Sequence, residues 1–238
     1  FGGFRSVVII CCLTFAVQFC LEGVYRTRLF PILLLVGLAS ALVIVPYTDK
    51  LPRSVQRTFS FLPIQVDPAA KADAQASLEW RLEMWRVLWP EVHKYLFKGK
   101  GYGINPIDLY LAEESTRRGL AKNYEQAIIV GDYHNGPLSV LIPFGIWGMI
   151  AFLWFLIASF LALRRNYLYG EPALKRMNTF ILGYFVVRML MFFVFFGGIT
   201  LELYYLAGLV GLSVSLNGGV RHKSDLSDAV ASTRPALA

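Results

Sequence analysis

Long apolar runs separated by short polar connections make up most of the chain, and one long polar segment interrupts them. A helix that spans a bilayer needs about 20 mostly apolar residues, within a range of about 17–25. The pattern therefore predicts an all-α membrane protein with about five transmembrane helices, the last of them short. The expected spans are residues 4–22, 29–47, 138–163, 178–199 and 202–217.

The long polar segment divides the chain into four expected regions. Residues 1–47 hold the first two transmembrane helices, and residues 48–137 form one large extracytoplasmic loop. Residues 138–217 hold three further transmembrane helices, and residues 218–238 form a cytoplasmic tail. Because the chain begins with Phe1 rather than Met and shows no signal peptide, we interpret it as a fragment or an excised domain.

Basic residues indicate the orientation of these spans. Lys and Arg gather in the connections 23–28 and 164–177 and in the tail after residue 217. With five spans these three regions lie on one side, and the positive-inside rule makes that side cytoplasmic. The short connection near residue 200 has no Lys or Arg and lies opposite, together with the large loop.

Composition agrees with a membrane protein and limits the other classes. The chain is 56% hydrophobic and 16% charged, whereas soluble domains are about 45–50% apolar and about 25% charged. The net charge of +7 is no sign of nucleic-acid binding, because much of it lies in short connections beside the spans. The three cysteines fall in the first apolar run without metal-site spacing, so we expect them to serve in packing; they are Cys11, Cys12 and Cys20.

The large loop contains a predicted amphipathic helix. Residues 48–76 are rich in Pro, Ala and Asp and are expected to be extended. After them, apolar residues recur at helical spacing, with Ser77 as the expected N-cap and Pro90 expected to interrupt or end the helix. This helix should lie against the membrane domain or its interface, with its Trp rings at the headgroup level. Its apolar stripe consists of Leu78, Leu82, Trp85 and Trp89.

Two short motifs leave alternatives open. In GKGYG, three alternating glycines can expose backbone N–H groups to a ligand, or they can simply form a turn after the helix. In HNGPL, His134 and Asn135 precede a long apolar run. They either mark the polar boundary of a helix or belong to a site at the membrane surface.

The order of motifs resembles the O-antigen ligase/polymerase family, over essentially the whole chain read as the C-terminal half of such a protein. The resemblance implies a polytopic glycosyltransferase of the bacterial inner membrane, active in lipopolysaccharide or other surface polysaccharide biosynthesis. It would move a glycan from undecaprenyl pyrophosphate to a sugar or lipid acceptor on the periplasmic face. The motifs are Ser77-x-x-x-Arg81-x-x-x-Trp85, Gly99-x-Gly101-x-Gly103, His134-Asn135-x-x-Leu138 and Gly145-x-x-Gly148.

The resemblance also implies which residues act. His134 matches the catalytic histidine before the span that follows the large loop, and Arg81 matches an arginine facing the same side. Arg5 is matched to a further arginine, although the usual Ser-Arg-Gly arrangement is absent. Together with Arg5 and Arg81, Gly101 and Gly103 are expected to bind the donor pyrophosphate.

Two further residues are expected to support the site. Asn135 either caps the span or orients His134. Arg188 lies inside an apolar run, where a charge is costly and faces the bundle interior. It is expected to pair with Glu202 or a lipid phosphate, or to support the site from below.

The residues suit a reaction without metal or other cofactor. The chain has no Asp-x-Asp pair and no cluster of His and carboxylates in the loop, so arginine would stabilise the leaving pyrophosphate. Histidine would take the acceptor proton, which suits inverting displacement, while retention through a loop carboxylate stays open. The expected partners are a lipid-linked glycan donor, a glycan or lipid acceptor and membrane lipids. The alternative function is a transporter or flippase-like protein for lipid-linked glycans.

Overall fold

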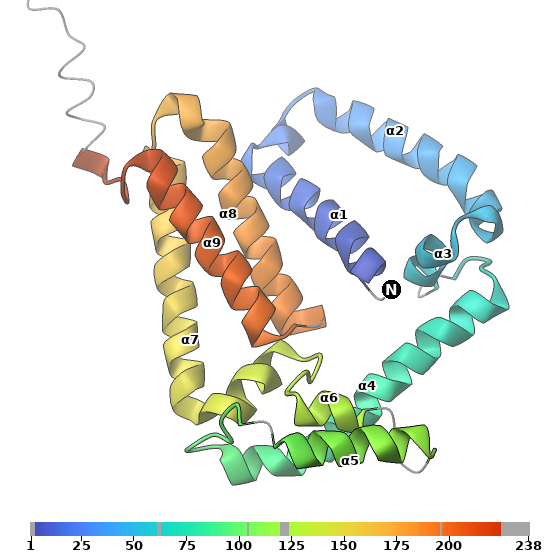
Figure 1. Ribbon diagram of the computed structural model, residues 1–238. Helices are drawn as coiled ribbons and strands as arrows, with labels where there is room; N and C mark the ends of the chain where they lie inside the picture. The colour runs from blue at the N-terminus through green and yellow to red at the C-terminus, as the bar shows by residue number, and fades with distance from the viewer. Residues whose placement is uncertain (1–2, 61–62, 104, 120–123, 196, 225–238) are drawn as a thin grey trace, which may run out of the picture.

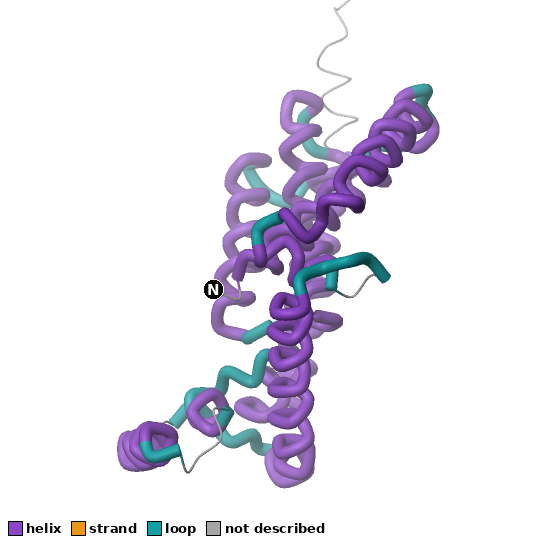
Figure 2. Tube along the Cα trace, turned by 90° about the vertical axis from the view of Figure 1, so that its right-hand side faces the viewer, coloured by secondary structure: helices purple, strands orange, loops and turns teal. Residues whose placement is uncertain are grey.

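The computed structural model describes residues 3–60, 63–103, 105–119, 124–195 and 197–224. The side chains of residues 3–5 and of Ser54 lie outside this description. Across the described ranges the chain forms helices and loops without a strand, which confirms the predicted all-α class (Figures 1 and 2). The α-helices are α1 (Gly3–Leu21), α2 (Leu29–Ile44), α3 (Arg53–Phe59), α4 (Pro68–Tyr95), α5 (Pro106–Arg117), α6 (Glu125–Ile129), α7 (Gly136–Tyr169), α8 (Lys175–Leu190) and α9 (Ile199–Asn217). Three 3₁₀-helices and one π-helix complete them: η1 (Val24–Arg26), η2 (Val45–Lys50), η3 (Pro172–Leu174) and the π-helix η4 (Met191–Phe195).

Four helical stretches of the described chain are long and apolar enough to cross a membrane. A shorter apolar helix, Ser6–Leu21, lies where the first span is predicted, so the count of five stays a prediction. The predicted boundary between the last two spans is wrong, because helix ends after Phe195 and resumes at Ile199. Gly197 and Gly198 lie in this interval, and glycine weakens a helix by exposing and freeing its backbone. The four stretches are Leu29–Lys50, Gly136–Tyr169, Pro172–Phe195 and Ile199–Asn217.

The packed core joins α7, α8 and α9, and α1 lies along α8 (Figure 1). Phe152, Leu156, Phe185 and Leu206 are almost fully buried between these helices. By contrast, α2 is exposed along its whole length. The three cysteines of α1 are also exposed rather than packed, so the predicted packing role is wrong.

The bundle has two distinct ends. At one end lie the α1–α2 connection, the α7–α8 connection and the end of α9 (Figure 1). The Tyr167 hydroxyl there donates to the Leu21 carbonyl at 2.9 Å, and the Asn166 amide donates to the Gly219 carbonyl at 3.3 Å. The structure thus gathers the three basic regions at one end, which we call the basic end, as the predicted orientation requires. The opposite end, where α7 and α9 begin, we call the loop end.

The large loop is more helical than expected. The helix α4 begins at Pro68, with the Asp67 carboxylate accepting from the Ala69 N–H at 2.9 Å. Ser77 therefore lies inside the helix and is not its N-cap, and the chain before it is not extended throughout. The alanines of residues 69–76 are strong helix formers and Pro suits a first helical turn, which explains the early start. The helix also continues past Pro90, an exposed position, to Tyr95.

The face of α4 that packs inside the protein differs from the predicted stripe. Met84, Leu88 and Val92 are buried against the residues that precede and begin α7. Of the predicted stripe, only Trp85 is partly buried, whereas Leu78, Leu82 and Trp89 are exposed. Both sets of residues have helical spacing. Periodicity alone therefore could not tell which face of α4 packs against the rest of the protein and which face is exposed.

The GKGYG segment, residues 99–103, packs against a break in α7. Pro143 lies inside α7, and Gly145 has φ 67° and ψ −166°, a conformation that glycine tolerates. The carbonyls of Ile142 and Pro143 accept from the N–H groups of Lys100 and Gly101, at 2.7 and 2.9 Å. The GKGYG segment therefore satisfies backbone groups at the break, which accounts for its close approach to α7.

Candidate functional site

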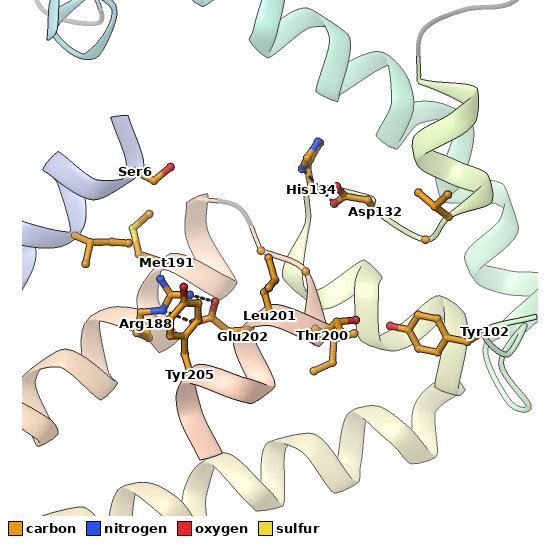
Figure 3. Close-up of a pocket in the computed structure, with 16 residues that line it drawn as sticks. Ser6, Tyr102, Asp132, His134, Arg188, Met191, Thr200, Leu201, Glu202 and Tyr205 are labelled. Carbon is orange, nitrogen blue, oxygen red and sulfur yellow. Dashed lines mark hydrogen bonds and ion pairs between the residues drawn. The ribbon is translucent and has the colours of Figure 1, made fainter. Parts of the chain in front are cut away.

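A cavity of about 480 Å³ lies at the loop end of the bundle (Figure 3). Its wall is built from α1, the turn before α7, the end of α8 and the first turn of α9, which are far apart in the sequence. Figure 3 shows two ionisable pairs at this cavity, one from the turn and one from α8 and α9. The polar side chains of the wall are Ser6, Tyr102, Asp132, His134, Arg188, Thr200, Glu202 and Tyr205.

The first pair is His134 with Asp132. His134 has φ 46°, in the left-handed region that costs a non-glycine residue about 1–3 kcal/mol. Its Nδ1 lies 3.2 Å from Oδ1 of Asp132, and its ring packs beside Trp80 with the centroids 5.3 Å apart. Because Nδ1 faces the carboxylate, Nε2 is left for another partner.

Tyr133 anchors this turn to α4. Its side chain is buried, and its carbonyl accepts a hydrogen bond from Nε1 of Trp85 at 2.9 Å. Burial raises the pKa of the Tyr133 phenol to about 12. The turn that carries His134 is therefore fixed from within the loop.

The start of α7 fixes the same turn to the other helices. Oδ1 of Asn135 accepts from the Leu138 N–H at 3.0 Å and caps α7. A Cβ added at Gly136 would lie 2.2 Å from the Phe192 carbonyl oxygen, so this position approaches η4 too closely for any side chain. Oγ of Ser139 accepts from the Ile199 N–H at 2.9 Å, which ties the start of α7 to the start of α9.

The second pair is Arg188 with Glu202. Nε and Nη2 of Arg188 donate to the two carboxylate oxygens of Glu202 at 2.8 and 2.5 Å. The two side chains are only 12% and 6% exposed. The Tyr205 ring lies against the guanidinium, with its centroid 4.2 Å from Cζ. Of the predicted alternatives for Arg188, the structure shows pairing with Glu202.

The structure brings two predicted site residues, His134 and Arg188, into one cavity wall. Arg81 is not among the residues of that wall, although the preceding residue, Trp80, contacts the His134 ring. Arg81 is half-buried on α4, and burial lowers the pKa of its guanidinium. Asn135 takes the first of its two predicted roles, the cap.

The other predicted pyrophosphate ligands are Gly101, Gly103 and Arg5, and neither glycine lines this cavity. The Gly101 N–H already donates to the Pro143 carbonyl at 2.9 Å, so this donor is used inside the protein although Gly101 itself is exposed. Gly103 is exposed and is not among the residues that line the large cavity, although the neighbouring Tyr102 is. Arg5 belongs to α1, but its side chain lies outside the described residues.

Sequence reasoning gave too little weight to Asp132 and Tyr205. Asp132 was one of many loop carboxylates, and only its place two residues before His134 could have marked it. Tyr205 has no distinguishing signal beyond its position one turn after Glu202. Over the described part of the chain, no group of three or more His, Cys, Asp and Glu side chains could hold a metal ion.

Fold and site together define an all-α membrane protein with an ionisable cavity at one end of its bundle. The family described as O-antigen ligase matches residues 2–153, so the chain belongs to this family of membrane glycosyltransferases. The match confirms the resemblance predicted from the motifs; it covers α4 and the His134 turn, while Arg188 and Glu202 lie beyond it. No curated protein and no solved structure matches the chain.

Proposed function

We propose that the protein transfers a glycan from a polyprenyl pyrophosphate donor to a sugar or lipid acceptor, at the periplasmic face of the bacterial inner membrane. The observation that supports this proposal is the cavity at the loop end. Its wall combines the ionisable residues His134 and Arg188 with apolar residues such as Ile10 and Leu201. A donor with an isoprenoid chain and a charged headgroup needs both kinds of contact.

In the proposed reaction, His134 acts as the general base. The acceptor hydroxyl oxygen forms a bond to the anomeric carbon of the donor sugar. The bond from that carbon to the pyrophosphate breaks, and the pyrophosphate leaves with the electron pair. Nε2 of His134 takes the acceptor proton, while Asp132, 3.2 Å from Nδ1, orients the ring and stabilises the imidazolium. This direct displacement inverts the anomeric carbon.

Arg81 is our proposed ligand for the leaving pyrophosphate. A guanidinium offers parallel N–H donors that match phosphate oxygens, and partial burial strengthens such bonds. Arg81→Lys keeps the charge but loses the planar fork, so glycan transfer should fall by about a hundredfold or more. Near-normal transfer by a well-expressed Arg81→Lys protein would assign Arg81 to the loop's structure instead.

The placement of charge supports an enzyme over a transporter. A transporter of the inverted-repeat kind places its substrate site near the bilayer midplane, in broken helices. Here the ionisable pairs lie at the loop end, with Arg188 in the last turn of α8 and Glu202 in the first turn of α9. Both belong to the cavity that contains the proposed base.

The decisive experiment replaces His134 in a strain that lacks the native protein. A general base contributes about a hundred- to ten-thousandfold, so His134→Ala should abolish detectable glycan transfer without lowering protein level. His134→Gln can orient a hydroxyl but cannot act as a base, and should also fail. His93→Ala is the matched control, since His93 is exposed on α4. Full transfer by both His134 variants would overturn the base role of His134, and equal transfer with and without the unaltered protein would overturn the proposed function.

A further inference from the structure

Arg188 and Glu202 form an ion pair that is both buried and open to a cavity. Arg188 comes from the last turn of α8 and Glu202 from the first turn of α9, and both line the cavity that holds His134. Their two hydrogen bonds use Nε and Nη2 of the guanidinium. The third nitrogen, Nη1, still carries donors that this pairing does not use.

A contribution to fold stability does not readily explain why this buried ion pair is present. Replacing a buried ion pair with apolar residues of similar volume is often neutral or stabilising, whereas removing one partner alone is strongly destabilising. A pair that served packing would also need no cavity beside it. This pair borders about 480 Å³ of open space, together with the hydroxyl groups of Ser6, Thr200 and Tyr205.

The surroundings of Arg188 favour an anion with an apolar tail. The first turn of α9 lines the same cavity, and the positive end of a helix dipole favours negative charge. Ile10, Met191 and Leu201 add apolar surface to the wall. Arginine is the side chain best suited to phosphate oxygens, because its donors form a planar fork.

We infer that Arg188 binds a phosphate group of a polyprenyl-linked ligand, and that Glu202 is the internal counter-ion that holds the guanidinium when this ligand is absent. On binding, the phosphate takes the guanidinium edge that Glu202 occupies in the structure. The counter-ion keeps Arg188 from being a lone buried charge in the empty site. This inference rests on the proposed function for the identity of the ligand, but the binding itself can be measured without any transfer.

The two residues then have opposite effects on affinity. Glu202→Gln removes the negative charge that competes with phosphate but keeps a carbonyl that accepts from Arg188. Its affinity for a phosphate ligand should rise by about tenfold, the effect of one displaced charged hydrogen bond. Arg188→Met/Glu202→Leu removes both charges together and leaves no lone ion, so the protein should fold but bind about ten- to a hundredfold more weakly.

The test uses farnesyl pyrophosphate as the probe and titration calorimetry of the full chain in detergent, with thermal melting as the measure of folding. Arg176→Met is the matched control, because it removes an exposed arginine from the other end of the same helix. It should bind the probe as the unaltered protein does. A folded Arg188→Met/Glu202→Leu protein with unchanged affinity, or a folded Glu202→Gln protein that binds no more tightly, would overturn the inference.

Two comparisons identify the source of the phosphate. Inorganic pyrophosphate should bind more weakly than farnesyl pyrophosphate, and equal binding would refute a lipid-linked ligand. Adding phosphatidylglycerol should not displace the probe, and complete displacement would assign the site to bulk lipid. If the variants bind as expected while a strain that carries the unaltered protein transfers no more glycan than a strain that lacks it, the proposed function fails and the phosphate site stands.

Discussion

The two ends of the α7–α8–α9 bundle both bury polar side chains, but they differ in charge and in open space. At the basic end, Asn166, Asn178 and Asn217 are 1–2% exposed and bond to one another and to nearby groups. The amide of Asn178 donates to the Asn166 carbonyl and to Oδ1 of Asn217, both at 3.0 Å. At the loop end, His134 and Arg188 have carboxylate partners and line a cavity.

The amide cluster at the basic end holds helices together, whereas the ionisable pairs at the loop end are placed to bind a ligand. Neutral amides that satisfy one another hold three helices in a fixed arrangement without the desolvation cost of charges. Ionised groups beside a cavity can instead exchange partners with a ligand. We therefore expect substitutions at the basic end to change stability, and substitutions of the loop-end pairs to change transfer.

The largest expected effect is an all-or-none difference in labelling between the two ends. With the native cysteines replaced, Ala72→Cys in the large loop should react with an impermeant thiol reagent in cells with a permeabilised outer membrane. Ala173→Cys, exposed beside the basic end, should not react until the inner membrane is opened. Labelling of position 173 and not of position 72 while the inner membrane is still closed would reverse the predicted orientation.

Gly136→Ala should have the next largest effect, on folding. The new Cβ would meet the Phe192 carbonyl oxygen at 2.2 Å, where backbone must move, and overpacking of this kind costs about 3 kcal/mol or more. Thermal melting in detergent would measure the loss. Gly208→Ala is the control, since a Cβ there has open space around it. Equal melting temperatures for the two variants would show that the α7–η4 contact is looser than described.

Asn178→Ala tests the basic end. It removes the donors to Asn166 and Asn217 and leaves their buried oxygen atoms short of partners, which should cost about 2–3 kcal/mol of stability. Transfer per folded molecule should be unchanged, because this cluster lies far from the cavity along the bundle. A loss of specific activity with unchanged melting would contradict the assignment of the two ends.

Asp132→Asn should have the smallest effect of the four. Asp132 positions His134 and is itself more than half exposed, so we expect about a tenfold fall in kcat with little change in KM or melting temperature. Asp132→Glu should restore part of the rate. An unchanged kcat, or a change in KM alone, would show that the carboxylate does not orient the base.

Several features could be predicted from the sequence because they depend on neighbours along the chain. Apolar length indicated where helices cross the membrane, and Asn135-Gly136-Pro137 marked the start of α7. The position of His134 beside that start, together with the motif order, identified the family and one side of the site. Other features needed the fold, such as the early start of α4 and the choice of its buried face.

The sequence by itself determined the class, the approximate positions of the long apolar helices and the candidate base, because hydrophobic length, caps and local motifs act over a few residues. Tertiary structure decided which of the possible partners meet, such as Glu202 rather than a lipid phosphate for Arg188. Asp132 and His134 are two residues apart in the chain, but Arg188 and Glu202, which line the same cavity, come together only when α8 and α9 pack. Likewise, the fold uses the N–H groups of Lys100 and Gly101 to satisfy carbonyls that the break at Gly145 left without helical partners. Such pairings depend on distances in space, and a one-dimensional pattern does not contain them.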